Sequence, residues 1–249
     1  MPFPLDLLLL VVLPYAAIVV CVVGTIERYR RHSFSVTSLS SQFFENRRHF
    51  WGIMPFHLGI LAVLAAHVAW FLFPSLVLRW NARPVRLYAA EVALLACGIA
   101  ALLGFLVVGF RRGADARLQR VTSAWDWCVY ALLVAQIALG VAVALRHTWG
   151  SSWFAAAVAP YLWSLVRLNP DTTAAATLPL LAKAHVVLAY LLVAIFPFSR
   201  LVHVLAVPNP YLWRRPQVVR WPPPSRVRAT ARQAPADETA RQAGHHVGA

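Results

Sequence analysis

The chain has 249 residues, of which 60% are hydrophobic and only 13% are charged, and its mean hydropathy is +0.62. A soluble domain of this composition could not cover its surface with polar groups, so the sequence indicates an integral membrane protein. The 23 basic and 9 acidic residues give a formal net charge of +14. The arginines flank apolar segments, which favours a role in membrane orientation over binding of nucleic acid.

Five apolar segments reach the ~20 residues that a helix needs to cross a bilayer. We expect these membrane spans near residues 4–26, 52–73, 87–110, 125–146 and 179–206. The first span has no basic leading region and runs into Glu27 and Arg28, so it is expected to stay in the protein rather than to be removed as a signal peptide. Pro14 in the first span and Pro197 in the last should kink their helices.

The distribution of basic residues predicts the orientation in the membrane. The segments that follow spans one, three and five carry 17 Lys and Arg residues, and the opposite side carries six. The six are Arg79, Arg83, Arg86, Arg146, Arg167 and Lys183. Because the cytoplasmic side of a membrane protein carries the excess of positive charge, we expect a multi-pass protein of the cytoplasmic membrane with its N-terminus outside and its C-terminus in the cytoplasm.

Two segments outside the spans also carry predictions. The loop 147–178 is long enough for a short interfacial helix around Pro160–Leu168, where Tyr161 and Trp163 suit the lipid headgroup region. Residues 208–249 are rich in Pro, Arg and Ala and cannot bury enough apolar surface to fold alone. The sequence therefore predicts an all-α, five-span membrane domain over 1–207 and a cytoplasmic tail over 208–249, which first docks on a partner and then is disordered.

Four histidines lie inside the apolar segments, two on span two and two on span five: His57, His67, His185 and His203. An ionisable residue within a membrane span indicates a functional site. Because the two spans run in opposite directions, His67 would meet His185 near the outer face, and His57 would meet His203 near the cytoplasmic face. Iron with two imidazole ligands has no open position, which favours electron transfer. The alternative is that the four are polar core residues that make interhelical hydrogen bonds.

The spacing of the four histidines is uneven. His57 and His67 are ten residues apart, about 15 Å along a helix and about 80° around it. His185 and His203 are eighteen residues apart, about 27 Å on one face of a continuous helix. Tilt and the kink expected at Pro197 would have to absorb a difference of about 12 Å.

Several sequence runs around these histidines resemble the gamma subunit, the cytochrome b, of membrane-bound respiratory nitrate reductases. The runs are SSQ at 40–42, FHLGIL at 56–61, LLVAQIALG at 132–140, FPFSRLVH at 196–203 and VP at 207–208. The resemblance implies five spans that hold two b-type haems, with the four histidines as axial ligands in the same two pairs. It also implies quinol (menaquinol or ubiquinol) oxidation near the outer haem and electron transfer to a cytoplasmic iron–sulfur subunit and a molybdenum subunit that reduces nitrate.

The chain differs from the family pattern at two places. Ala66 stands where a glycine usually precedes the outer histidine of span two, and the loop before span three has no lysine for the quinol site. Arg86 is the nearest basic residue to that lysine, with Arg83 as the alternative. Two other functions stay open: a related cytochrome b that serves another cytoplasmic reductase, such as one of sulfur metabolism, or a haem-free anchor whose histidines relay protons.

Further charged residues are candidates for the chemistry that the resemblance implies. Glu91, near the start of span three, could accept quinol protons, or it could be a solvated carboxylate at a helix start. Lys183 could pair with a haem propionate or a quinol oxygen, or it could extend to the membrane interface. On the cytoplasmic side Arg112 and Arg200 are candidates for haem propionates, with positive-inside flanking as the alternative.

Two polar residues of span four have structural predictions. Asp126 suits a helix start, where a carboxylate interacts favourably with the helix dipole. Gln136 lies in the middle of the span and should form a hydrogen bond with a neighbouring helix.

Overall fold

The structure is a computed structural model that describes residues 4–31 and 47–204. The chain divides into two units, Met1–Val207 and Pro208–Ala249. The second unit and the SSQ run at 40–42 lie outside the described residues, so the division into domains and the predicted docking of the tail remain predictions.

In the part of the chain that the structure describes, every regular element is a helix. Five helical stretches are long and apolar enough to cross a membrane: Leu5–Arg31, Trp51–Leu72, Pro84–Ala114, Ala124–Arg146 and Leu180–Phe198. They consist of α1 (Pro4–Leu7), η1 (Leu8–Val12) and α2 (Leu13–Arg31) for the first, then α3 (Arg47–Leu72), α5 (Pro84–Ala114), α7 (Ala124–Arg146), and α11 (Leu180–Ile195) with η5 (Phe196–Phe198). The predicted all-α fold with five membrane-length helices is confirmed.

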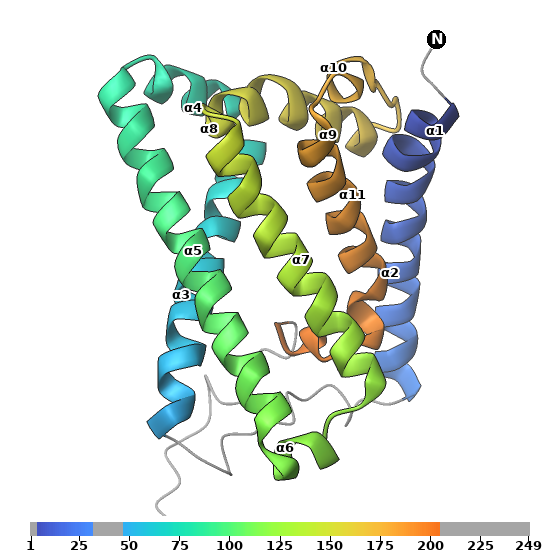
Figure 1. The fold of residues 1–249 in the computed structure, drawn as a ribbon. Coiled ribbons are helices and arrows are strands. Elements are labelled where there is room, and N and C mark those ends of the chain that lie inside the picture. Colours follow the sequence, from blue (N-terminus) through green and yellow to red (C-terminus); the bar gives the residue numbers. More distant parts are fainter. Residues whose placement is uncertain (1–3, 32–46, 205–249) are drawn as a thin grey trace, which may run out of the picture. The chain divides into compact units, whose positions relative to one another are not determined.

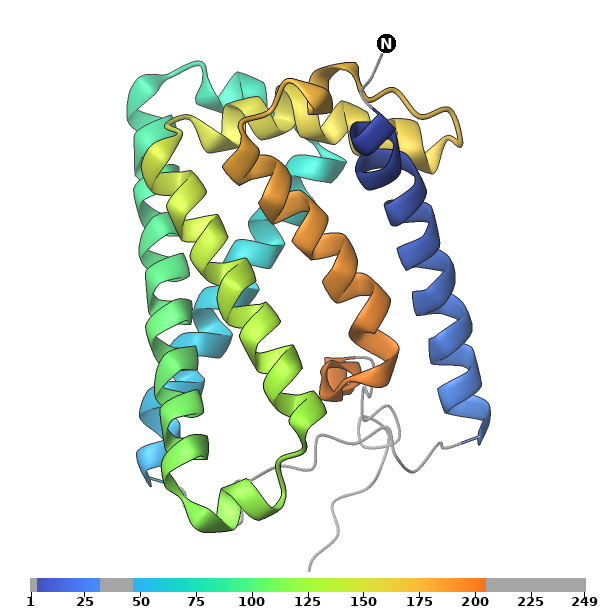
Figure 2. The same cartoon turned by 45° about the vertical axis from the view of Figure 1, so that its right-hand side comes forward.

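The long helices pack in the order α3, α5, α7, α11 and α2 (Figures 1 and 2). The closest approach is between α3 and α5, where glycines leave room for the neighbouring backbone. A Cβ atom on Gly104 would lie 2.6 Å from Gly52 O, and one on Gly59 would overlap Cys97 O. Small residues let membrane helices pack backbone to backbone. This contact holds α3, and with it His57 and His67, firmly against α5.

Short helices lie across one end of the bundle, which we call the outer end because the arginine count predicts that it faces outside (Figure 1). They are α4 (Pro74–Asn81), α8 (Gly150–Trp153), η4 (Phe154–Val158), α9 (Ala159–Val166) and α10 (Thr173–Ala176), while α6 (Ala116–Arg120) lies at the opposite, inner end. The helix predicted near Pro160 is confirmed as α9, but Tyr161 does not face the lipid headgroups as expected, because its side chain is buried against the first span. Trp163 joins it to α3, because its Nε1–H donates to Phe71 O at 2.9 Å.

Pro14 leaves one backbone carbonyl of the first span without its helical donor, and a tyrosine from a distant helix donates to that carbonyl instead. Proline has no N–H to donate to the carbonyl four residues earlier, which is Leu10 O. A π-helical turn, η1, directly precedes α2, and the Tyr161 hydroxyl of α9 donates to Leu10 O at 2.7 Å. Burial raises the pKa of Tyr161 to about 12, so the hydroxyl remains a donor at neutral pH.

The last span differs from the prediction. The α-helix ends at Ile195, and 3-10 turns over Phe196–Phe198 and Arg200–Val204 (η6) flank an extended Ser199. The chain turns off the axis of α11 here (Figures 1 and 2). Pro197 interrupts the backbone hydrogen bonds, and Arg28 Nη1 of α2 donates to Pro197 O at 2.6 Å and to Ser199 O at 2.8 Å.

The expectation that His185 and His203 lie 27 Å apart on one continuous helix is therefore wrong. Between the two histidines the α-helix continues only as far as Ile195, ten residues after His185, which is a rise of about 15 Å. His57 and His67 on α3 are separated by the same rise. His203 belongs to the turned segment η6 rather than to α11, so its distance from His185 is not the rise of one continuous helix.

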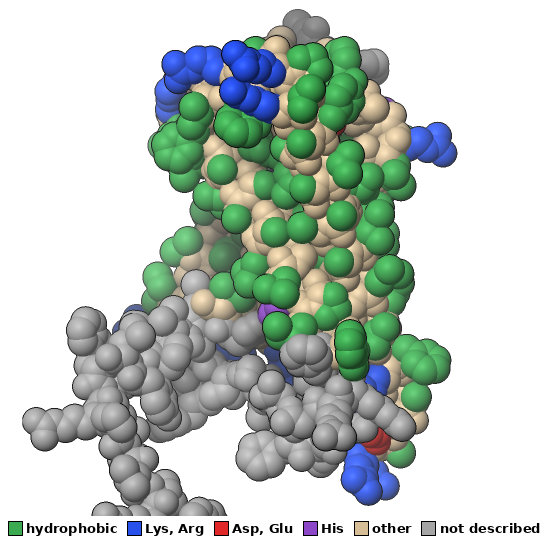
Figure 3. Space-filling model, turned by 90° about the vertical axis from the view of Figure 1, so that its left-hand side faces the viewer, with side chains coloured by type: hydrophobic (Ala, Val, Ile, Leu, Met, Phe, Trp, Pro, Cys, Tyr) green, Lys and Arg blue, Asp and Glu red, His purple; other side chains and the backbone are tan. Residues whose placement is uncertain are grey.

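The surface of the bundle suits lipid. On the face drawn in Figure 3, hydrophobic side chains cover the middle of the molecule, and Lys and Arg side chains gather toward its ends. Large apolar side chains along the helices, such as Leu58 on α3 and Val92 on α5, are 62% and 65% exposed. Such exposure is costly in water and favourable in hydrocarbon.

Candidate functional site

His67 of α3 and His185 of α11 face each other toward the outer end of the bundle. Their ring centroids lie 6.5 Å apart, and the ring planes are inclined by 48°. Two imidazole nitrogens that each bind one metal ion at about 2 Å lie about 4 Å apart, which places the ring centroids about 6 Å apart. The observed separation therefore fits a metal ion held between the two rings. Phe154 of η4 packs edge-on against His67, with centroids 5.5 Å apart.

Both histidines of α3 have one ring nitrogen engaged by their own helix. His57 Nδ1 lies 2.9 Å from Ile53 O, and His67 Nδ1 lies 2.8 Å from Val63 O. A carbonyl oxygen can only accept, so Nδ1 carries the proton and the lone pair of each ring is on Nε2. Metal-binding histidines almost always have this arrangement, with the second nitrogen donating to a carbonyl or carboxylate. The sequence placed the two histidines on one helix but could not show that both adopt this tautomer.

His185 has a different environment. Gln136 of α7 places its Nε2 3.5 Å from His185 Nε2, so the predicted hydrogen bond of Gln136 with a neighbouring helix is confirmed. Gly140, one turn further along α7, lets that helix pass beside the ring, because a Cβ atom there would lie 3.0 Å from His185 Cε1. His185 Nδ1 is buried and has no hydrogen-bond partner among the described residues. Sequence reasoning did not identify Gly140.

The partner predicted for His57 is His203. The backbone of His203 lies in η6, but its side chain is outside the described part of the structure, so this pair remains a prediction. The ring of His57 packs edge-on against Phe56, with centroids 4.9 Å apart, and Phe56 stacks on Phe105 of α5.

Arg200 and Arg112, predicted near the inner haem, lie close together. Arg200 forms a two-pronged ion pair with Asp126 of α7, through Nε at 2.8 Å and Nη2 at 2.9 Å. Asp126 also accepts from the backbone N–H of Ser123 at 2.9 Å, which confirms its role at the start of α7. Arg112 of α5 is near enough to interact electrostatically with both Arg200 and Asp126. This cluster connects η6, the segment of His203, to α5 and α7.

The three residues predicted for the quinol site engage separate partners at the outer end. Glu91 accepts from the backbone N–H of Trp149 at 3.0 Å and from that of Ser151 at 3.3 Å, and so binds the start of α8. The other two also have partners. Lys183 Nζ pairs with Asp6 Oδ1 at 3.2 Å, and the Arg86 guanidinium lies 4.9 Å from the centre of the Trp80 ring. Asp6 was not among the residues predicted for the site, although it is the only acidic residue in the first span before Glu27.

With this geometry established, the chain can be compared with known proteins. The family model for the nitrate reductase gamma subunit matches residues 6–222. The chain belongs to the nitrate reductase gamma subunit family. It is 31% identical over 212 residues to the nitrate reductase gamma chain of Bacillus subtilis, covering 84% of this chain and 95% of the relative. It is 29% identical to the respiratory nitrate reductase 1 gamma chain of Escherichia coli, covering 83% of this chain and 93% of the relative.

Another relative is larger. The nitrate reductase-like protein NarX of Mycobacterium tuberculosis is 31% identical over 208 residues, but the match takes up only 32% of its length. The family membership confirms the resemblance seen in the sequence. This gamma subunit is accordingly a multi-pass membrane protein and a subunit of an oxidoreductase of nitrate respiration.

The arrangement of ligands in this gamma subunit suits haem better than a bare metal ion. Within residues 4–31 and 47–204, no group of three or more His, Cys, Asp or Glu side chains could hold a metal ion. A protein that offers only two facing imidazoles needs a macrocycle to supply the remaining ligands, as the porphyrin of a haem does. The free nitrogens of His67 and His185 therefore fit the axial positions of a haem.

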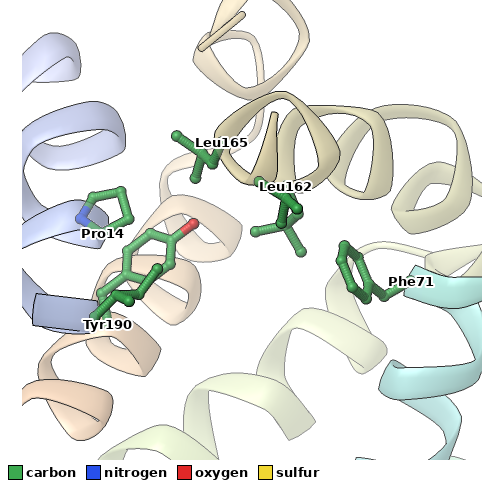
Figure 4. Close-up of a pocket in the computed structure, with 7 residues that line it drawn as sticks. Pro14, Phe71, Leu162, Leu165 and Tyr190 are labelled. Carbon is green, nitrogen blue, oxygen red and sulfur yellow. The ribbon is translucent and has the colours of Figure 1, made fainter. Parts of the chain in front are cut away.

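A small apolar pocket of 180 Å³ lies apart from the charged residues of the outer end. Pro14 of α2 and Tyr190 of α11 line one side, and Leu162 and Leu165 of α9 and Phe71 of α3 line the other (Figure 4). None of the predicted quinol-site residues Arg86, Glu91 or Lys183 lines it. The pocket offers contacts for hydrocarbon and not for an anionic group.

Proposed function

We propose that this gamma subunit is the membrane cytochrome b of a nitrate reductase complex and that it binds two b-type haems. His67 and His185 would hold one haem near the outer end, and His57 and His203 would hold the other near the inner end. The observation that carries the proposal is the facing pair His67 and His185, whose ring separation of 6.5 Å fits a metal ion between them. The family membership supports the assignment to nitrate reductase.

The bound haems would supply reversible one-electron chemistry at iron atoms that have no open coordination position. The chain's own residues determine how each iron is held. Val63 O and Ile53 O fix the tautomers of His67 and His57, so both Nε2 lone pairs are available as ligands. The close packing of α3 on α5 holds these two rings at a fixed axial distance, which two haems stacked across a membrane require.

We further propose that the outer end oxidises quinol, either menaquinol or ubiquinol. Arg86, Glu91 and Lys183 supply the charged groups on that side, with Glu91 as the proton acceptor and the two cations available to quinol oxygens. The excess of arginines at the other end predicts that electrons leave on the cytoplasmic side. There the chain would serve an iron–sulfur subunit and a molybdenum subunit. Arg112 and Arg200 would lie near the propionates of the inner haem.

A reduced-minus-oxidised spectrum of the purified chain tests the haem assignment. The unaltered protein should show b-type α bands from two haems, and His67→Ala and His185→Ala should each abolish the same one. His57→Ala and His203→Ala should abolish the other. Loss of the same haem in His67→Ala and His203→Ala would overturn the pairing, and an unaltered protein without a b-type α band would indicate a haem-free anchor. If the chain co-purifies with the subunits of another reductase, the terminal electron acceptor is the substrate of that reductase and not nitrate.

A further inference from the structure

Two buried polar atoms without partners lie on residues in contact at the outer histidine pair. His185 Nδ1 and Gln136 Oε1 are both buried and have no hydrogen-bond partner among the described residues. Yet the two side chains touch, since Gln136 Nε2 lies 3.5 Å from His185 Nε2. The amide meets the ring at Nε2, so Nδ1 is the ring nitrogen left without a partner and Oε1 is the unused acceptor of the amide. Buried polar groups almost always find partners, so this coincidence calls for an explanation.

The chemistry of a metal-bound imidazole provides one. When one ring nitrogen binds iron, the other carries a proton and needs an acceptor. His57 and His67 find that acceptor in the carbonyl four residues earlier on α3. No equivalent bond to α11 is present at His185, and the polar side chain that contacts its ring is Gln136. The amide can present its oxygen instead of its nitrogen by a half-turn about its terminal bond, since the two ends have nearly the same shape. His185 Nε2 would then carry the proton that the oxygen accepts, and Nδ1 would be the ring nitrogen left for the iron.

We propose that Gln136 is the positioning residue of the outer haem, an inference that rests on the proposed function. Its amide oxygen accepts the N–H of the His185 ring, fixes the orientation of that ring, and makes the imidazole a stronger donor to iron. Gly140 supports this role, because the absence of a side chain there lets α7 bring Gln136 against the ring. A more basic ligand stabilises ferric iron, so Gln136 lowers the midpoint potential of the outer haem.

Redox titration of the purified haem-loaded protein tests this role without a measurement of activity. In the titration, the outer haem is the one whose redox wave is absent from His67→Ala. Gln136→Leu removes the acceptor and should raise the midpoint potential of that wave alone, changing its ferric-to-ferrous ratio about tenfold, or ~59 mV for a one-electron couple. Gln136→Glu keeps an acceptor oxygen and should return the potential to the wild-type value or below. Ala135→Leu is the matched control, since Ala135 is an exposed neighbour on the same helix.

The outcomes separate the two proposals. A shift of the outer wave in Gln136→Leu, absent from Ala135→Leu and restored in Gln136→Glu, supports the role of Gln136. Two bound haems with an unshifted outer wave overturn it and leave the haem assignment intact. Equal shifts of both waves, or the same shift in Ala135→Leu, also overturn it, because they indicate a general change in packing. An unaltered protein without b-type haem refutes the proposed function and this inference together.

Discussion

Replacing Tyr161 with Phe tests how the outer end of the bundle is held together. The substitution removes only the hydroxyl, which donates to Leu10 O at 2.7 Å and accepts from Tyr190 at 2.9 Å. Tyr161 is 2% exposed and Leu10 is 1% exposed, so water cannot replace the lost partner. An unpaired buried polar group costs about 1–3 kcal/mol in soluble proteins. Hydrogen bonds between membrane helices average only about 0.6 kcal/mol.

We therefore expect Tyr161→Phe to destabilise the protein by about 1–3 kcal/mol, because two bonds are lost and one of them serves a carbonyl that Pro14 leaves without an α-helical donor. The purified protein in detergent should melt at a lower temperature, as followed by the fraction that remains monodisperse after heating. Ser164→Ala is a matched control on the same helix, since it also removes two bonds but neither reaches another span: Ser164 Oγ donates to Tyr161 O within α9 and accepts from Asp171 N–H in the following loop.

A double-mutant cycle makes this prediction specific. Pro14→Ala restores a backbone N–H that can reach Leu10 O, so Tyr161→Phe should cost less in that background than in the wild type. An equal loss of stability in both backgrounds would refute the reasoning. It would mean that Tyr161 stabilises the bundle through packing or through Tyr190, and not by serving the carbonyl that proline leaves unpaired.

Three further substitutions probe the site. Gly140→Ala would place a methyl group 3.0 Å from His185 Cε1 and should lower the occupancy of the outer haem, measured by pyridine haemochrome, whereas Gly98→Ala, with its nearest neighbour at 3.4 Å, should not. Asp126→Asn removes the charge that pairs with Arg200 and should lower the free energy of unfolding by about 1–3 kcal/mol, seen as a lower melting temperature. An unchanged melting temperature would show that the ion pair does not stabilise the fold. Glu91→Gln cannot take up a proton, so quinol oxidation should slow, and because the amide keeps only one of the two oxygens that accept from the start of α8, the melting temperature should also fall; unchanged quinol oxidation would contradict the role of Glu91.

The sequence predicted those features that the membrane itself imposes. Hydrocarbon requires about 20 apolar residues per helix and leaves no water for an isolated polar group. Five spans, the interfacial helix α9 and the polar contact of Gln136 could therefore be read from composition and position alone. The antiparallel pairing of His67 with His185 followed from the direction of two helices, and the structure brings these rings together.

The features that could not be predicted depend on contacts distant in the sequence. Pro197 predicted a kink in the last span, but the sequence did not show that the α-helix would end at Ile195 and the chain turn off its axis. Arg28, which lies 169 residues before Pro197, donates to the carbonyls freed there. The pairing of Asp6 with Lys183 spans 177 residues in the same way. Local patterns do not contain such partners, and the predicted spacing of the histidines was wrong for this reason.

The end of the α-helix at Ile195 also affects how two haems could be held between the two helices. A continuous last helix would have separated its two histidines by about 27 Å against about 15 Å on α3, so no single pair of haems could have been held without distortion. Ending the α-helix at Ile195 places His203 on the turned segment η6 instead, and the ion pair of Arg200 with Asp126 anchors that segment to α7. The three described histidine rings differ in the group that meets a ring nitrogen: on α3 it is a backbone carbonyl of the same helix, and at His185 it is the side chain of Gln136 on α7.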